Sequence, residues 1–561
     1  MNIPPKTTPI SSFRQKAGES IKSKNQASLT VFLCLWLLAF LVRLIWIWPL
    51  HYNDWFGDAA YNVTIAEDIA DGKEARWVGR DSPFFVFTPL FHLSVALILL
   101  VSPLPGMTAA KLVSAASTSF VPPTLYLLLH RLTEERQKAL TGALIATFVP
   151  WFLALSVMTL ATGLFIALAV ASCAALLSIR GNQRIPISLI LAGLAALSRP
   201  EGAFFLLFTM VWILIIAFKR KDPAEWRMAL FSVILVCFGI IASMMIIWGW
   251  RAGDPFVWIV SMLSHQADEA QKGKLTLAEL GYLAIIILAT YSGFGGDPEP
   301  VRFDFYNVLR IGFAAALLLL IVYGFWVLIR DWRSGKLSKE IQEGYLFILS
   351  SWASMLIFLV LLDGRWIKYH VFGVMMIQPL FVTLAIFDLV KRISTASHVA
   401  QRVNIVSKKP SMVLILILSI LSIQFLFAFA TNAFLKSQMW EPRRELVEWL
   451  NETVPEDIVV VIPHREYYVT AYSLVESMNY EEIFAIAGLD QGPISQEQLL
   501  TVCQERNIQY LVTTSDSDRQ EGPYYSQIID LLSNRTTMEF SSRFKWRSIS
   551  IALIVLKITA I

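Results

Sequence analysis

The chain has 561 residues, of which 56% are hydrophobic and only 16% are charged, and its formal net charge is +4. An ordinary soluble domain carries about 25% charged residues, so this composition excludes a disordered protein, a disulfide-rich secreted module and a typical soluble enzyme. The slight basic excess is what lysines and arginines in the inner loops of a membrane protein produce, and it requires no nucleic-acid partner.

The first 28 residues are polar and basic. Their one acidic residue, Glu19, is outnumbered by five basic residues, which are Lys6, Arg14, Lys16, Lys22 and Lys24. No small-residue cleavage site follows the next apolar run, so the pattern differs from that of a cleavable signal peptide. We therefore expect residues 1–28 to form a cytoplasmic tail.

Residues 29–435 contain repeated uncharged runs of the length that crosses a bilayer as a helix, and they predict about 11–13 transmembrane helices. The runs are Thr30–Leu50, Pro83–Val101, Leu112–His130, Leu140–Met158, Thr159–Ile179, Gly202–Phe218, Met228–Trp250, Ile311–Ile329, Leu346–Leu362, Val371–Phe387 and Ser411–Leu435. Ile185–Ser198 is shorter but is counted as a span, because Arg184 and Arg199 can extend from its ends toward the membrane surfaces. Tyr282–Phe294 is also short and is expected in the interface.

An arginine and several tryptophans near the ends of the predicted spans are expected to lie at the membrane surfaces. Arg43 interrupts the first run, and its long side chain is expected to reach the outer surface. Tryptophans near span ends are expected to anchor the protein at the membrane interfaces. Examples are Trp46, Trp48, Trp248 and Trp250.

The charges between the runs predict the orientation, because loops rich in lysine and arginine stay on the cytoplasmic side. Lys219–Lys221 and Lys391–Lys409, the latter with five basic residues and no acidic one, are predicted to be cytoplasmic. The loop His51–Ser82, with seven acidic and three basic residues, is predicted to lie outside. Residues 251–310 and 436–561 then lie outside as well.

Two ways of counting the spans place the segment Arg131–Lys138 on different sides of the membrane. Counting spans from the N-terminus places it outside, whereas counting back from the last span places it inside. One segment between Pro83 and His130 therefore does not cross the membrane fully, or the runs there are divided wrongly.

Residues 436–561 have shorter apolar runs than the rest of the chain. Four of these runs have the length and composition of strands and are Asp457–Pro463, Ile483–Ala487, Ile508–Thr513 and Ser548–Lys557. Ser495–Glu505 has the pattern of a helix. The alternation predicts an extracytoplasmic α/β domain.

The first outer loop contains the residue pattern that is most informative about a possible catalytic site. Asp58, Tyr61, Ile65 and Ile69 are three to four residues apart, which predicts a helix with one apolar face lying on the membrane surface. Asp58 stands at the start of this helix, where a carboxylate can act as a cap or interact with the helix dipole. The pattern alone leaves open whether Asp58 does more than that.

Four motifs follow one another between residues 30 and 400. They are Asp58-Ala59-Ala60-Tyr61 with a helix and a turn at Gly72, Phe87-Thr88-Pro89-Leu90-Phe91, Leu197-Ser198-Arg199-Pro200-Glu201-Gly202, and Arg365-Trp366-Ile367-Lys368-Tyr369-His370. In this order they resemble the GT-C membrane glycosyltransferases. The resemblance is strongest to the bacterial branch of protein mannosyltransferases and lipid A aminoarabinose transferases, which is similar to glycosyltransferase family 39. An appended outer α/β domain is common in that branch.

The resemblance implies a multi-spanning helical GT-C fold and an inverting glycosyltransferase in a prokaryotic plasma membrane. Such enzymes move a sugar from a polyprenyl-phosphate carrier to a hydroxyl of a lipid, polysaccharide or protein at the outer face. A hydroxyl is a poor nucleophile at neutral pH, so a carboxylate must take its proton, and Asp58 is the candidate base. The sequence departs from the family pattern in two places, since Ala59 replaces a glutamate and the stretch Phe85–Thr88 just before Pro89 contains no lysine.

Further substrate contacts are implied by the same resemblance. The candidate residues are Asp54, Tyr61, Arg80, Arg199, Glu201, Arg365, Lys368 and Tyr369. Arg80, Arg365 and Lys368 are the outer cations that can meet a leaving phosphate. For Arg199 and Glu201 a local ion pair is the favoured interpretation, and for Asp54 a solvated loop position. Of Glu67 and Asp68, one is expected to face solvent.

No cofactor is expected. Asp297, Glu299 and Asp304 can in principle bind a divalent cation, but their spacing matches no known metal loop, so no metal site is assigned. Two other functions stay open, a transporter or lipid flippase and a scaffold that presents the outer domain. Few charges lie within the spans, which argues against a transporter.

Overall fold

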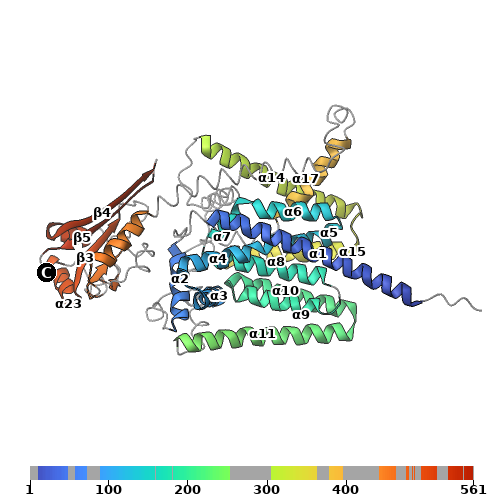
Figure 1. Ribbon diagram of the computed structural model, residues 1–561, viewed down its shortest axis with the longest axis horizontal. Helices are drawn as coiled ribbons and strands as arrows, with labels where there is room; N and C mark the ends of the chain where they lie inside the picture. Colours follow the sequence, from blue (N-terminus) through green and yellow to red (C-terminus); the bar gives the residue numbers. More distant parts are fainter. Residues whose placement is uncertain are drawn as a thin grey trace, which may run out of the picture.

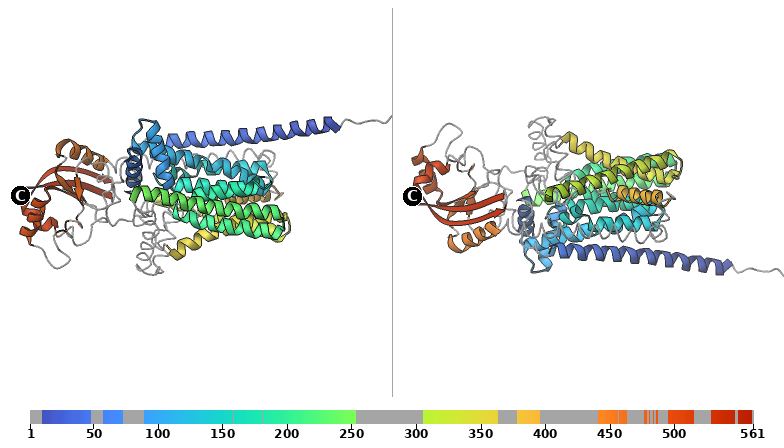
Figure 2. Two further views of the ribbon diagram at one scale, coloured as in Figure 1. Left: turned by 90° about the horizontal axis from the view of Figure 1, so that it is seen from below. Right: turned by 90° about the horizontal axis from the view of Figure 1, so that it is seen from above.

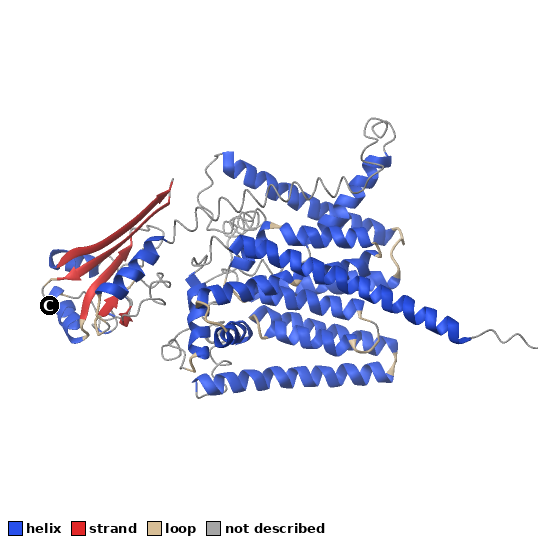
Figure 3. Ribbon diagram, viewed as in Figure 1, coloured by secondary structure: helices blue, strands red, loops and turns tan. Residues whose placement is uncertain are grey.

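The computed structural model describes most of the helical part of the chain and the core of the C-terminal part. The described residues are 10–47, 57–72, 89–157, 159–179, 181–252, 305–362, 378–395, 441–455, 457–462, 476–478, 480, 483, 486, 495–514, 528–546 and 549–559. They form a bundle of long helices and a separate small sheet flanked by helices (Figures 1 and 3).

The helices of the bundle run back and forth along one axis (Figure 1). They are α1 (Ile10–Ile47), α4 (Gly106–Ser119), α5 (Val121–Thr133), α6 (Arg136–Phe148), α7 (Pro150–Val157), α8 (Thr162–Ser178), α9 (Arg184–Ala196), α10 (Pro200–Arg220), α11 (Pro223–Ala252), α14 (Phe305–Arg333), α15 (Lys339–Leu362) and α17 (Gln378–Thr395). A single apolar core joins most of them, and apolar side chains of α10 and α11 also cover the outside of the bundle.

Within the described residues, five helical segments are long and apolar enough to cross a membrane. They are Leu29–Ile47, Gly106–Thr133, Glu201–Arg220, Pro223–Ile247 and Ala315–Arg333. Exposed leucine, isoleucine and phenylalanine side chains on α1, α10 and α11 are what a lipid-facing surface requires. The protein is therefore an integral membrane protein, as the composition predicts.

Two short helices lie across one end of the bundle. Figure 1 shows α2 (Gly57–Ala70) running across the end of the bundle and α3 (Pro89–Val101) viewed end-on beside it. We call this end of the molecule the α2 end. The turns between α5 and α6, α8 and α9, α10 and α11, and α14 and α15 lie at the opposite end, and the first half of α1 projects beyond it (Figure 2). The sheet lies beyond the α2 end (Figure 1).

The prediction that Pro83–Val101 spans the membrane is wrong. Its described part, the 13-residue helix α3, lies across the end of the bundle and not along the bundle axis (Figure 1). Without this crossing, α4 and α5 together lead from the α2 end to Arg131–Lys138 at the opposite end. This resolves the conflict between the two span counts in favour of the count from the C-terminus.

Prolines divide two of the predicted spans. Leu112–His130 corresponds to α4 and α5, and the two helices meet at Phe120, just before Pro122 and Pro123. Pro150 ends α6 in the same way, because the residue before a proline is driven to an extended backbone, and Val149 has φ −60° and ψ 125°. α4 and α5 still form one segment, Gly106–Thr133, that is long enough to cross a membrane, whereas the run Leu140–Met158 is divided at Pro150.

Arg43 does not reach the membrane surface as expected. Its side chain is fully buried, its Nε donates to Thr118 Oγ1 on α4 at 2.9 Å, and its Nη1 donates to the Ala39 carbonyl at 3.0 Å. Trp46, expected as an interface anchor, is also fully buried. Both predictions failed because an all-apolar helix carries no sequence signal for the face that packs on its neighbours.

Basic side chains gather at the opposite end of the bundle. They include Arg131, Arg136, Lys138, Arg184, Lys219, Arg220, Lys221, Arg330, Arg333 and Lys336. Two of them hold helices together, since Arg131 pairs with Glu340 at 2.6 Å and Arg184 with Glu225 at 2.6 Å. Arg184 thus forms an ion pair with α11 instead of extending freely from the end of its helix.

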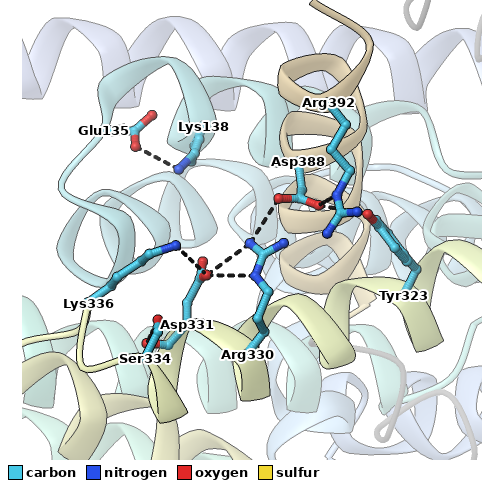
Figure 4. A network of polar contacts seen from close by, with 9 residues as sticks. All are labelled: Glu135, Lys138, Tyr323, Arg330, Asp331, Ser334, Lys336, Asp388 and Arg392. Atoms are coloured by element: carbon cyan, nitrogen blue, oxygen red, sulfur yellow. Dashed lines mark hydrogen bonds and ion pairs between the residues drawn. The ribbon is translucent and has the colours of Figure 1, made fainter. Parts of the chain in front are cut away.

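An ion-pair network joins α14 to α17 near this opposite end (Figure 4). Asp388 accepts from Arg330 at 2.9 Å, from Arg392 at 2.8 Å and from the Tyr323 hydroxyl at 2.7 Å. Gly324 lies so close to Phe381 that an added Cβ would be 1.9 Å from its carbonyl oxygen. The two helices are therefore in close contact and are joined by polar bonds.

The C-terminal part contains a five-stranded sheet in the order β2-β1-β3-β5-β4. The strands are β1 (Val459–Val461), β2 (Glu476–Met478), β3 (Ile508–Thr514), β4 (Thr536–Trp546) and β5 (Ile549–Ile558). β1 is parallel to β2 and β3, whereas β5 is antiparallel to β3 and β4. Alternate residues of β1 and β3 enter two separate cores, one against the helix at 441–453 and one against α23 (Gln496–Glu505).

Three of the four predicted strands and the predicted helix are confirmed. The helix begins with a capping box in which Ser495 and Gln498 bond to each other's backbone. The predicted strand Ile483–Ala487 is wrong, because Ile483 and Ile486 are helical, and the strand at this edge is β2. Tyr480, Ile483 and Ile486 recur every third residue, which is a helical spacing. β4 was not predicted, and the domain start near residue 436 lies outside the described residues.

Candidate functional site at the α2 end

The helix α2 forms as the spacing of its apolar residues predicts and packs flat on the end of the bundle. Val63 and Ala66 are fully buried in an apolar cluster with residues of α3 and α4. Gly72, two residues past the helix end, has φ +67°, a conformation that favours glycine. The predicted helix and its glycine turn are both confirmed, but the fully buried apolar residues Val63 and Ala66 are not on the predicted face of Tyr61, Ile65 and Ile69.

The acidic residues of α2 lie deeper than expected. Asp68 is only 1% exposed, and Glu67 is half-buried. Glu67 lies against Gly106 at the start of α4, where an added Cβ would be 2.0 Å from its Oε1. A carboxylate at a helix N-terminus is favourable. Neither acid is the solvent-facing charge that the sequence pattern suggests.

Asn62 is the polar link between α2 and its neighbours. It is 2% exposed, its Nδ2 donates to the Thr159 carbonyl at 3.1 Å, and its Oδ1 lies 2.7 Å from Nε2 of His92 on α3. His92 is also 2% exposed. These bonds join the first outer-loop motif to α3, which begins within the second motif at Pro89.

A backbone hydrogen bond joins the second motif to the third. The Leu90 amide donates to the Leu197 carbonyl at 2.9 Å, at the point where α9 has ended and α10 has not begun. Three of the four motifs that resemble the GT-C enzymes are thus in contact at the α2 end. The fourth, Arg365 to His370, lies outside the described residues.

Arg199 and Glu201 form the ion pair that the sequence favours. The guanidinium binds both carboxylate oxygens at 2.9 to 3.2 Å, and its Nη1 donates to Thr162 Oγ1 at 2.5 Å. The side chains are 14% and 6% exposed. Because Thr162 begins α8, the pair ties the start of α8 to the start of α10.

The sequence explains why α10 begins here. Pro200 occupies the first turn, where its missing N–H is not needed, and Glu201 follows it near the positive end of the helix dipole. Gly202 is required for close approach, because an added Cβ would be 2.2 Å from the Ala195 carbonyl oxygen. The Arg-Pro-Glu-Gly motif therefore has a packing role that can be stated residue by residue.

The predicted site residues divide into three groups. Arg199 and Glu201 are described and paired, and Asp58 and Tyr61 are placed on α2 by their backbone only. The remainder lie outside the described residues, namely Asp54, Arg80, Arg365, Lys368 and Tyr369. Sequence reasoning missed Asn62 and His92. Their signal was a polar residue that can both donate and accept hydrogen bonds, placed among the apolar residues of each of two adjacent helices.

Metal binding finds no support in the part of the chain that is described. There, no three residues of the histidine, cysteine, aspartate and glutamate types lie close enough together to hold an ion. The acids Asp297, Glu299 and Asp304 lie outside that part.

Comparison with known proteins identifies the fold. No family model and no curated protein sequence matches the chain. The crystal structure of ArnT from Cupriavidus metallidurans bound to undecaprenyl phosphate matches with a TM-score of 0.58 over 94% of this chain and 97% of that chain, at 11% identity. The arabinofuranosyltransferase AftD from mycobacteria matches with a TM-score of 0.47 over 94% of this chain and 41% of its own, at 15% identity. ArnT is a GT-C aminoarabinose transferase, so this chain has the fold of the GT-C membrane glycosyltransferases.

Proposed function

We propose that this protein is an inverting glycosyltransferase that moves a sugar from a polyprenyl-phosphate carrier to a hydroxyl acceptor. The observation that carries the proposal is the meeting of three motifs at the α2 end, through the Asn62–His92 and Leu90–Leu197 hydrogen bonds. The fold agrees with it, since the similar ArnT structure holds undecaprenyl phosphate.

In the proposed reaction, the acceptor oxygen attacks the anomeric carbon of the sugar as the bond to the phosphate oxygen breaks. The phosphate leaves with the electron pair of that bond, and the acceptor proton goes to a carboxylate. Asp58, the second residue of α2, is the proposed base. Attack opposite to the leaving phosphate inverts the anomeric centre.

The departing phosphate needs positive charge that is not already neutralised. Arg199 binds Glu201 through Nε and Nη2, and the charges of the two side chains cancel. We therefore assign the Arg199–Glu201 pair a structural role and propose Arg80, Arg365 and Lys368 for the phosphate. Asp54, Tyr61 and Tyr369 remain proposed substrate contacts.

The orientation is part of the proposal. The α2 end is proposed to face outward, because basic residues gather at the opposite end and basic loops remain in the cytoplasm. The donor would then be used at the outer face of a prokaryotic plasma membrane.

The base is tested by Asp58→Asn in the purified protein. We expect transfer of the lipid-linked sugar to fall by at least about 100-fold, because general-base catalysis contributes about that much or more. Asp71→Asn is the matched control, since Asp71 is an exposed acid in the turn after the same helix. Transfer at the parental rate by Asp58→Asn would show that another group is the base.

The donor class is tested with undecaprenyl phosphate itself. The compound is expected to raise the melting temperature of the purified protein, because a ligand that binds only the folded state stabilises it. Undecaprenol, which lacks the phosphate, serves as the control and should give a smaller shift. Equal shifts for the two lipids would argue against a phosphate site. Glycan and lipid profiling of a deletion strain would then identify the sugar and the acceptor.

A further inference from the structure

Most of the contact that holds α2 on the bundle is apolar. Val63 and Ala66 are fully buried against α3 and α4. Apolar contacts have no preferred direction, so they resist rotation or sliding of this 14-residue helix less than directional hydrogen bonds do. Position 58 is one turn before Asn62, and any such rotation displaces it.

Asn62 supplies a directional contact to two neighbouring elements. One atom of its amide group bonds to the Thr159 carbonyl at 3.1 Å and the other to His92 at 2.7 Å. The two partners belong to different elements, the segment before α8 and the helix α3. A planar amide bound at both ends has one orientation, and this fixes the rotation of α2.

The direction of each bond follows from the chemistry of the amide. A carbonyl only accepts, so the Asn62 nitrogen must face Thr159, and the Asn62 oxygen must then face His92. His92 therefore carries its proton on Nε2 and donates it. Replacing either side chain by an apolar one leaves a buried polar group without this bond, which is unfavourable.

The partner of Asn62 is itself anchored to the core. His92 lies two residues after Leu90, whose amide donates to the Leu197 carbonyl. Leu197 is followed by Arg199, which bonds to Thr162 at the start of α8. A continuous series of contacts thus runs from α2 through α3 to the starts of α8 and α10.

We propose that Asn62 and His92 are positioning residues that hold α2 in the one orientation in which Asp58 can accept the proton of the acceptor. This rests on the proposed function. Neither residue is assigned a contact with substrate. Because a displacement of about 1 Å in a reacting group can reduce the rate about 100-fold, the pair is expected to affect kcat far more than donor binding.

The test compares His92→Gln, which keeps an N–H donor, with His92→Phe, which keeps a ring but has no donor. We expect kcat to fall about 10- to 100-fold in His92→Phe and in Asn62→Leu, with the KM for the lipid-linked donor changed by less than about 3-fold. His92→Gln should recover much of the loss. The double variant should be no slower than Asn62→Leu alone, because that variant already removes the bond to His92.

Ser94→Ala is the matched control, because Ser94 lies on α3 and bonds only to Leu90 of its own helix. It should retain the parental kcat. A parental kcat in His92→Phe would overturn the proposal, as would equal losses in His92→Gln and His92→Phe. So would a loss of activity that merely follows the amount of folded protein.

A second measurement does not depend on transferase activity. Amide hydrogen exchange over residues 57–72 should be faster in His92→Phe than in the parent, while the bundle helices keep their protection. Unchanged exchange in α2 would overturn the positioning role. If the parent protein transfers no sugar, the proposed function fails, and the exchange result alone decides whether the pair orders α2.

Discussion

Single residues at the α2 end show how few polar groups organise a largely apolar protein. Asn62, His92, Arg199 and Glu201 are all largely buried, and each binds a partner on another element or at a helix start. A polar group that is buried without a partner is unfavourable, so such side chains occur where they are bonded. Their bonds define how the short helices sit on the long ones.

The Arg199–Glu201 pair gives a prediction at the residue scale. Glu201→Ala should lower the free energy of unfolding by about 3–5 kcal/mol, because it leaves the nearly buried Arg199 guanidinium without its carboxylate. Thermal melting of the purified variant in detergent measures this. Arg199→Met in the Glu201→Ala background should restore part of the loss.

The control for this prediction is the Arg131–Glu340 pair, which has a similar distance but is 43% and 74% exposed. Glu340→Ala should change the stability by no more than about 1 kcal/mol, because exposed ion pairs contribute little. Comparable melting temperatures for Glu201→Ala and Glu340→Ala would contradict the assigned structural role.

At the scale of elements, the junction of α14 and α17 combines close packing with ion pairs. Beyond the Asp388 bonds, the Arg330 and Arg392 guanidinium carbons each lie 5.3 Å from the ring centre of Trp326. The Arg330 guanidinium also binds Asp331 at 2.9 Å (Figure 4). These contacts hold together two helices that are joined through residues 334–377 of the sequence.

Two glycines of α14 provide a matched test of this packing. Gly324→Ala should destabilise the protein by about 1–3 kcal/mol, because its Cβ would meet the Phe381 backbone and force the helices apart. Gly312→Ala has open space around it and should be neutral or stabilising by up to about 1 kcal/mol, since alanine favours the helix. Melting temperatures distinguish the two, and a Gly324→Ala protein as stable as Gly312→Ala would show that the helices are not in close contact.

At the scale of the whole molecule, charge is distributed unevenly along the bundle axis. Many basic residues lie at the turns of the opposite end, where acids such as Glu225 and Glu340 pair with some of them, whereas Glu67, Asp68 and Asp71 lie on or beside α2. This arrangement is the basis of the proposed orientation. It places the sheet domain, beyond the α2 end, on the same side as the proposed site (Figure 1).

The orientation is tested by cysteine labelling in intact cells. Asp71→Cys and Lys336→Cys are both exposed positions, one beside α2 and one at the opposite end. In a background without Cys34, Cys173, Cys237 and Cys503, a membrane-impermeant maleimide should label position 71 only. After permeabilisation it should label both. Labelling of position 336 alone in intact cells would reverse the orientation.

The sequence predicts features that depend on local spacing. The surface helix with its turn at Gly72, the Arg199–Glu201 pair, the strands at 459–461 and 508–514 and the capped helix after Ser495 all follow from residues close together in the chain. The apolar spans follow from composition alone. The roles of Asp58, Arg80, Arg365 and Lys368 stay predictions.

Only the tertiary structure decided which helix faces and helix ends are in contact. The sequence could not show that α3 lies across the bundle, that Arg43 is turned inward to Thr118, or that Asn62 and His92 are paired. These depend on contacts between residues 30 or more positions apart, and an apolar helix looks the same to sequence analysis whether it faces lipid or protein. The sequence by itself determined that this is a multi-spanning membrane protein. The packing of its helices determined how α2, and with it Asp58, is held against the bundle.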